Sequence, residues 1–461
     1  ALNFVCNRLR LVDSGIHFNL SASIYLCLAE LCSTLRLHCL TELPKFMPDV
    51  LQTYESNAVM RHELLLTSVI SCLSKLVRTL CDFLTPYLLE IIKRTCNLLT
   101  QPALVLASGT NQNELRLRTM WTYIANFVPH RLLFPTLHDF IEQDKFVLND
   151  IEPLMTLLKQ SIAVASVEDL NINFQLLKNL FLKLFTLRTI HTKQIHPNKM
   201  NDYEDHVFDC FSELVMRLSE ESFRPLFFTI YEWAVYNEPP REHSVTFYRL
   251  TLVLAKKLKS LFSLFAGHII QHAATTLDLL NLSKNEKQDQ KYFSDNKFAD
   301  DNAIELINGI LGTISNICLF DSVGFINNER FQLLMSPVVD QLEQHVPTTV
   351  DYQQWIERHV SPCIVNLTAA SKEEPLWRRL HYQLLLKTKS DSSQIRLATL
   401  HILQELSRKL SVNYQSLLAE AVPYLAELME DSNEKVENAC HRVIVDMEST
   451  LGESLQQYFN A

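Results

Sequence analysis

Histidine is the residue type whose spacing in this 461-residue chain comes closest to a metal site. His268 and His272 are four residues apart on a predicted helix, so both side chains could face one zinc ion. No glutamate of an HExxH motif lies between them, and no third ligand is evident. Two ordinary helix histidines are the better interpretation, and we predict no metal ligand and no cofactor.

The 11 cysteines fit neither a metal site nor a redox motif. The spacing of Cys27, Cys32 and Cys39 matches no standard zinc pattern, and the sequence contains no CxxC. An odd number of cysteines scattered over a long chain also argues against a secreted disulfide framework. We therefore expect a reducing compartment, cytosol or nucleus, with most thiols packed as small hydrophobic groups.

Glycine is too scarce for several kinds of active site, with only 7 residues in the chain. Neither GxSxG nor a glycine-rich phosphate loop is present. Gly309 and Gly312 lie inside an apolar stretch, which favours close packing of helices over phosphate binding. The sequence thus predicts no catalytic residue, no enzyme activity and no small-molecule substrate.

The composition is that of a globular, mostly helical protein. Hydrophobic residues make up 47% of the chain and charged residues 20%, while the few glycines disfavour β-barrels and sandwiches. The net charge of −10 argues against a dominant nucleic-acid groove, because such grooves are usually basic. No run approaches ~18 apolar residues, so we expect no membrane span.

Apolar residues recur with helical period along the chain. Clear stripes run from Val436 to Leu451 and from Phe247 to Phe265. A proline precedes an apolar segment at six places: Pro44, Pro86, Pro135, Pro225, Pro337 and Pro423. The intervals between these prolines are mostly one or two units of ~40–47 residues, which is the HEAT/armadillo period. Proline suits the first turn of a helix. We predict an all-α, HEAT/armadillo-like α-solenoid of antiparallel helix pairs, with about ten or eleven units.

The repeat is clearest near the end of the chain. A helix from Pro423 to Glu430 is followed by the turn Asp431-Ser432-Asn433, whose residues favour helix caps, and a second helix opens at Lys435-Val436. One unit earlier, a turn at 390–393 precedes Ile395-Arg396. An aspartate followed by valine or isoleucine beside a basic residue is typical of HEAT repeats.

Two polar stretches interrupt the pattern: residues 281–303 predict a mobile surface loop and residues 191–205 a shorter one. The resulting organisation is N-terminal helical repeats over 1–169, a helical domain over 170–280, the polar loop at 281–303, and C-terminal HEAT repeats over 304–461.

Basic residues gather weakly at two places. Lys256, Lys257 and Lys259 follow an apolar stripe, and a second set lies at the shorter loop: Arg188, His191, Lys193, His196 and Lys199. A solvated face is the default interpretation, and contact with an RNA backbone is the alternative. Our candidate contact residues are Arg224, Trp233, Arg249, Lys256 and Lys257, of which the first three could equally belong to the core.

Long collinear segments resemble a known family: the very large nucleolar HEAT-repeat protein of the small-subunit processome, associated with small nucleolar ribonucleoproteins. They include ESFRPLFFTIYEW (221–233), TFYRLTLVLAKKLKSLFSLFAGHII (246–270), GFINNERFQLLMSPVVDQLE (324–343), LWRRLHYQLLLKTKS (376–390), IRLATLHILQEL (395–406), VPYLAELMEDSNEKVENACHRVI (422–444) and LGESLQQYF (451–459). The resemblance covers roughly residues 170–460, and this chain is similar to the C-terminal part of those longer proteins.

The resemblance implies a non-catalytic nucleolar scaffold acting in pre-rRNA transcription and 18S rRNA processing. It implies processome proteins as partners, β-propeller subunits among them, and contact with pre-rRNA and small nucleolar ribonucleoproteins indirectly or through weak basic patches. Two alternatives remain open: a HEAT-repeat scaffold in nuclear transport or phosphatase assembly, and a module whose main activity is direct binding of pre-rRNA.

Overall fold

The protein is described from a computed structural model. It describes residues 5, 18–53, 62–100, 112–142, 146–236, 239–281, 292–293, 298–348 and 350–452, and every regular element among them is a helix. The chain forms two compact units. Unit 1 consists of Ala1–Phe185 and Asn201–Phe223, and unit 2 of Thr186–Met200 and Arg224–Ala461.

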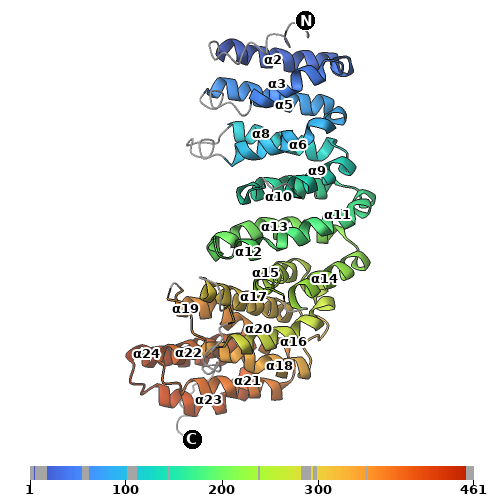
Figure 1. The fold of residues 1–461 in the computed structure, drawn as a ribbon. Coiled ribbons are helices and arrows are strands. Elements are labelled where there is room, and N and C mark those ends of the chain that lie inside the picture. Colours follow the sequence, from blue (N-terminus) through green and yellow to red (C-terminus); the bar gives the residue numbers. More distant parts are fainter. Residues whose placement is uncertain are drawn as a thin grey trace. The chain divides into compact units, whose positions relative to one another are not determined.

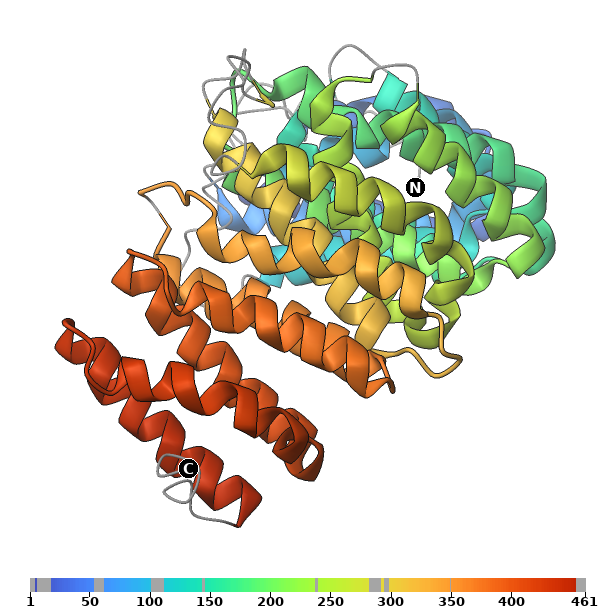
Figure 2. The same cartoon turned by 90° about the horizontal axis from the view of Figure 1, so that it is seen from below.

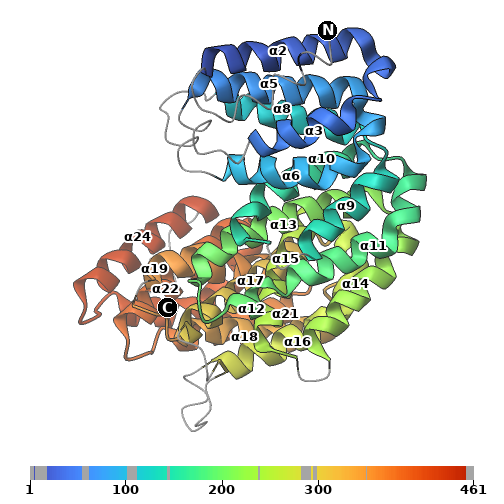
Figure 3. The ribbon, with the colours of Figure 1, turned by 45° about the horizontal axis from the view of Figure 1, so that its top comes forward.

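Unit 1 stacks helix pairs in two layers, as Figures 1 and 3 show. One layer runs α2 (Phe18–Leu35), α5 (Glu63–Leu80), α8 (Gln112–Phe127) and α10 (Ile151–Val164). The other runs α3 (Leu43–Thr53), α6 (Thr85–Leu99), α9 (His130–Glu142) and α11 (Val167–Phe185). From Asn201 on, α13 (Pro197–Arg217) packs in this unit beside α10, to which an ion pair between Lys159 and Asp209 joins it.

Unit 2 by itself has the same two-layer architecture. One layer runs α15 (Arg241–Leu258), α17 (Ala299–Leu319), α20 (Ser361–Ala370), α22 (Ser393–Leu410) and α24 (Glu434–Leu451). The other runs α16 (Ser263–Leu280), α18 (Asn328–Val339), α21 (Glu374–Lys387) and α23 (Gln415–Leu428). From Arg224 on, α14 (Glu220–Val235) packs against α15 and α16. Figure 2 shows the last helices of this unit side by side. The predicted α-solenoid is confirmed.

Short elements join the long helices. The 3₁₀ turns are η2 (Arg36–Cys39), η3 (Cys81–Phe83), η4 (Leu148–Asp150), η5 (Lys259–Phe262), η6 (Asp340–Glu343) and η8 (Ser411–Tyr414). Two short α-helices are α12 (Leu187–His191) and α19 (Tyr352–Trp355), and η7 (Ile356–Val360) is a π-helix.

The α15–α16 connection corrects the sequence prediction. The stripe from Phe247 to Phe265 predicts one continuous helix, but α15 ends at Leu258 and Lys259 takes a φ of 52°. η5 then turns the chain, so Phe262 is buried whereas Leu261 is 61% exposed. Arg36 and Ser411 have the same positive φ after α2 and α22, which are also 18 residues long and end on leucine.

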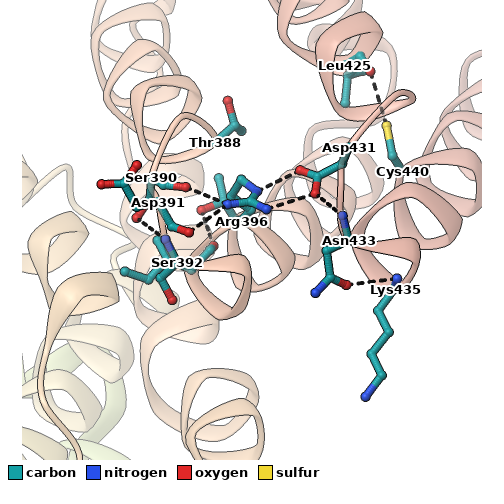
Figure 4. Close-up of polar contacts among 12 residues, drawn as sticks. Thr388, Ser390, Asp391, Ser392, Arg396, Leu425, Asp431, Asn433, Lys435 and Cys440 are labelled. Atoms are coloured by element: carbon teal, nitrogen blue, oxygen red, sulfur yellow. Dashed lines mark hydrogen bonds and ion pairs between the residues drawn. The ribbon is translucent and has the colours of Figure 1, made fainter.

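A mostly buried ion pair couples the last two repeats (Figure 4). The Arg396 Nε and Nη2 atoms lie 2.7 and 2.8 Å from the two carboxylate oxygens of Asp431, and Arg396 Nη1 donates to the turn carbonyls of Ser390 and Asp391. Asn433 then caps α24 by accepting from the Lys435 amide. The predicted cap is thereby confirmed.

Basic side chains also cap helix ends across neighbouring repeats in unit 1. Lys183 on α11 donates to the Ile141 carbonyl at the end of α9. Arg217 on α13 donates to the Ala165 carbonyl just after α10, at 2.5 Å. The last carbonyls of a helix have no partner within it and carry partial negative charge, so these contacts stabilise one repeat through the next.

The prolines do not mark helix starts as uniformly as expected. Pro86 lies in the first turn of α6, but Pro135, Pro225, Pro337 and Pro423 lie inside α9, α14, α18 and α23. Each removes one hydrogen bond of its helix. Packing of the flanking apolar residues keeps the helix going on both sides, as at α23, which begins at Gln415 rather than at Pro423.

Both predicted loops are shorter than expected. In the segment 191–205, α13 begins at Pro197. In the segment 281–303, α17 begins at Ala299, and residues 282–291 and 294–297 lie outside the described residues. Between them Phe293 is only 5% exposed, and Tyr292 stacks on the Arg241 guanidinium, 4.3 Å from the ring centroid. This aromatic pair anchors the polar segment to α15.

The expectation about membrane spans needs correction as well. Among the described residues, Phe18–Cys39, Glu63–Phe83 and Ala299–Leu319 have the length and mean hydropathy of a membrane-crossing helix. Serine, threonine and small residues separate their leucines, so no unbroken apolar run reveals them. In the structure, 67% of the apolar window within Ala299–Leu319 is buried, and the helix packs between α15 and α20.

Candidate functional site

The helices α14 and α15 carry all five candidate contact residues and share an aromatic core with η5 and α16. Phe227 of α14 lies 6.2 Å from Phe247 of α15, 6.0 Å from Phe262 of η5 and 5.3 Å from Phe265 of α16, measured between ring centroids. These rings are at most 3% exposed. Their burial places these four rings in the core of unit 2 and leaves them no face for stacking on a partner.

Two glycines set the distance between α15 and α17. A Cβ atom on Gly309 would lie 3.0 Å from the Tyr248 Cβ and 3.1 Å from its carbonyl carbon. A Cβ on Gly312 would meet the end of the Leu252 side chain at 2.9 Å. Thr251 and Thr313 bond across the same contact at 3.1 Å. The predicted close packing is confirmed.

His272 and His268 do not converge on a metal position. The His272 Nδ1 lies 2.7 Å from the hydroxyl of the buried Tyr248, and burial lowers the pKa of this histidine. His268 is exposed and packs edge-on against Phe228. Among the described residues no group of three or more His, Cys, Asp or Glu side chains could hold a metal ion.

Three of the candidate residues are exposed. Lys256 and Lys257 lie in the last turn of α15, where positive charge complements the helix dipole, and neither makes an ion pair with a described residue. Arg224 lies near the start of α14, with its guanidinium 5.8 Å from the Phe265 ring.

The other two candidates are held within unit 2. Trp233 is half-buried and stacks on His243, with ring centroids 4.0 Å apart. Arg249 is 12% exposed, and its Nε lies 3.6 Å from a Glu305 carboxylate oxygen. Their surroundings support a structural role for both side chains. The five candidates therefore do not form one cluster.

The second basic set has acidic and polar neighbours that offset part of its charge. Arg188 is 2% exposed and donates to Asn302 at 3.1 Å. His196 lies 3.8 Å from an Asp301 oxygen, and Thr192 bonds Glu242. Acidic neighbours on α15 and α17 thus offset the charge expected at this turn.

A further cation, Arg358, lies near Lys256, and sequence reasoning missed it. It belongs to a π-helical turn in which the Ser361 amide donates to the Ile356 carbonyl, and Pro362, which lacks an N–H, cannot donate to the Arg358 carbonyl. Burial, and then the charges of Arg358 and Lys256, lower the pKa of His359 to about 4. Lys256 and Arg358 therefore act on the same part of the unit 2 surface.

Comparison with known proteins shows which domain contains the helices that carry the candidate residues. Residues 169–326 match the BP28CT (NUC211) domain. The chain is 35% identical to HEAT repeat-containing protein 1 of Homo sapiens over 96% of its length, and 23% identical to U3 small nucleolar RNA-associated protein 10 of Debaryomyces hansenii over 90%. It spans about a fifth of both proteins, 20% and 22% respectively.

The solved structure of Kap121p is also similar, with a TM-score of 0.49 and 13% identity over 95% of this chain and 45% of that one. At that level the two chains need share nothing beyond stacked helices. The sequence matches are different in kind, because they run through nearly the whole chain. The chain therefore belongs to the family of HEAT repeat-containing protein 1 and U3 small nucleolar RNA-associated protein 10.

Proposed function

We propose that this protein is a scaffold of the small-subunit processome and acts in ribosome biogenesis, in nucleolar pre-rRNA transcription and 18S rRNA processing. The observation that carries the proposal is the match of nearly the whole chain to HEAT repeat-containing protein 1 and to a protein named for its association with U3 small nucleolar RNA. The location that follows is the nucleolus.

The architecture supports a scaffold role. A helix pair cannot bury its apolar face alone, so stacked pairs form a solenoid with a large surface for its mass. In unit 2, hydrogen bonds join side chains of neighbouring repeats: the Trp355 indole of α19 donates to Asn308 of α17 at 2.7 Å, and Asn366 of α20 donates to Ser315 of α17 at 3.0 Å. Such ties hold partner-binding surfaces at fixed spacing.

The charge favours protein partners over RNA as the main contacts of this chain. Its net charge is −10, and the second basic set is offset by acidic neighbours. We propose that other processome proteins, β-propeller subunits among them, bind this part of the protein. Pre-rRNA would be reached mainly through them.

Depletion of the protein in cells tests the function. A processome scaffold predicts loss of 18S rRNA and accumulation of its uncleaved precursor, while large-subunit rRNA falls less. Re-expression of a resistant full-length copy serves as the control. Normal 18S maturation after efficient depletion would contradict the proposal.

A further inference from the structure

The end of unit 2 at which α15 and α17 finish carries an exposed apolar surface. Four large side chains there are about half exposed or more: Leu261 at 61%, Leu264 at 49%, Leu319 at 50% and Val323 at 74%. Leu261 belongs to η5 and Leu264 to the first turn of α16. Apolar side chains gathered at one place on a surface commonly mark a contact with another protein.

The topology brings these side chains together. Gly309 packs on Tyr248 and Gly312 on Leu252, so α15 and α17 run in the same direction and end on the same side. η5 contacts α17, and the Lys259 ammonium lies 5.9 Å from the ring of Phe320, the residue after Leu319. The end of α17 therefore lies beside the turn that carries Leu261 and Leu264.

The loop after α17 is held firmly in place. One carboxylate oxygen of Asp321 accepts from the amides of Val323 at 3.2 Å and Phe325 at 2.8 Å, and the other accepts from Ile326 at 2.8 Å. These bonds fix the position of Val323 before any partner arrives, which lowers the entropy lost on binding. They also direct the one acidic side chain of this loop into its own backbone.

Lysines border the apolar side chains. Lys256 and Lys257 end α15, and Lys259 begins η5. Lys256 and Lys257 make no ion pair with a described residue, and Lys259 contacts the Phe320 ring. We call this surface the lysine-bordered edge: Leu261, Leu264, Leu319 and Val323 with Lys256, Lys257 and Lys259.

We propose that the lysine-bordered edge binds an amphipathic segment of a partner protein that carries leucine-type side chains on one face and acidic side chains around it. The apolar side chains supply the desolvated centre of the contact, and the lysines pair with the carboxylates at its rim. RNA fits less well, because the exposed side chains at the centre are aliphatic and offer no stacking surface for bases. The partner class rests on the proposed scaffold function, whereas the surface itself rests on the structure alone.

Binding of labelled probes to the full chain tests the proposal. The first probe is an amphipathic peptide of about 20 residues with leucine on one face and glutamate on the other, long enough to form a helix on contact. The second has lysine in place of glutamate, and the third is an oligouridine. We expect the glutamate peptide to bind most tightly and to weaken as salt is raised.

Two variants and a matched control locate the site. Leu261→Ser with Val323→Ser, and separately Lys256→Gln with Lys257→Gln, should each weaken the glutamate peptide about tenfold, the loss typical of a contact at an interface centre or several at its rim. The control Val445→Ser with Lys435→Gln changes an equally exposed valine and lysine on α24 and should leave affinity unchanged. Circular dichroism checks that each variant is folded.

Several outcomes would overturn the proposal. One is a lysine peptide that binds as tightly as the glutamate peptide. Another is a glutamate peptide that binds both edge variants as tightly as the unsubstituted chain. A third is binding of oligouridine that depends on Lys256 and Lys257 but not on Leu261. Sedimentation of the chain as a dimer that Leu261→Ser dissociates would show a second copy to be the occupant. Normal 18S maturation on depletion together with edge-dependent peptide binding would refute the processome role while leaving the edge as a binding surface.

Discussion

Replacing Gly309 by alanine should destabilise the protein whereas the same change at Gly312 should not, although both glycines face α15 in the same helix. At Gly309 the new Cβ would approach the backbone of Tyr248 and Arg249 at 3.1 and 3.2 Å. Backbone cannot step aside without moving α15, and forcing extra volume into such a contact costs about 1–3 kcal/mol. Alanine gains about 1 kcal/mol in helix propensity over glycine. The net loss at Gly309 should be about 1 kcal/mol.

At Gly312 the clash involves only the terminal carbons of Leu252, a half-buried side chain that can change rotamer. The propensity gain should then dominate, so Gly312→Ala should be neutral or stabilise by up to about 1 kcal/mol. The two substitutions share one chemistry and one helix, so the difference between them isolates the α15–α17 contact.

Hydrogen exchange of peptides from α15 and α17 measures the stability of this helix contact directly. A local measurement is needed because a chain of two units need not unfold in one step. We expect exchange roughly fivefold faster in Gly309→Ala, which corresponds to about 1 kcal/mol, and equal or slower exchange in Gly312→Ala. Equal effects of both substitutions, or slower exchange in Gly309→Ala, would refute the reasoning about helix spacing.

Three further predictions concern the repeats of unit 2. Arg396→Met leaves the carboxylate of Asp431, 7% exposed, without its cation and should cost about 3 kcal/mol in the free energy of local opening, measured by hydrogen exchange of peptides from α22 and α24. Arg408→Met breaks a more exposed pair and should cost less than about 1 kcal/mol, and similar costs would contradict the burial argument. Burial lowers the pKa of His381 to about 4, below its unfolded value of about 6.5. The free energy of unfolding should therefore fall by up to about 1.4 kcal/mol per pH unit as the pH drops from about 6.5 to about 4, and His381→Gln should reduce this slope. An unchanged slope in His381→Gln would contradict the role given to this histidine. Ser411→Gly relieves a φ of 49°, so it should stabilise the protein by about 1 kcal/mol and raise the melting temperature. A lower melting temperature would show that the turn is not strained.

Sequence reasoning predicted the helices well where apolar residues keep one period from cap to cap. The stripe on α24 is buried at Val436, Cys440 and Met447, and its cap is Asn433 as expected. Helical period, capping residues and turn composition are local properties, so they can be interpreted from sequence alone.

It failed where neighbouring repeats decide the outcome. Leu258, Leu261 and Phe262 keep the helical period through η5, so the period does not reveal the reversal of φ at Lys259. Arg249 was a candidate contact residue because the sequence does not reveal its ion pair with Glu305, a tertiary contact to a residue fifty-odd positions away in the chain. Exposure of Leu319 likewise depends on where α17 ends relative to its neighbours.

The central claim, a processome scaffold that binds proteins, is tested most directly by purifying the tagged protein from nuclear extract with and without RNase, followed by mass spectrometry. We predict that processome proteins are recovered in both samples. Recovery that disappears with RNase would contradict protein binding and favour direct contact with pre-rRNA. Recovery of transport factors or a phosphatase without processome proteins would contradict the scaffold function itself.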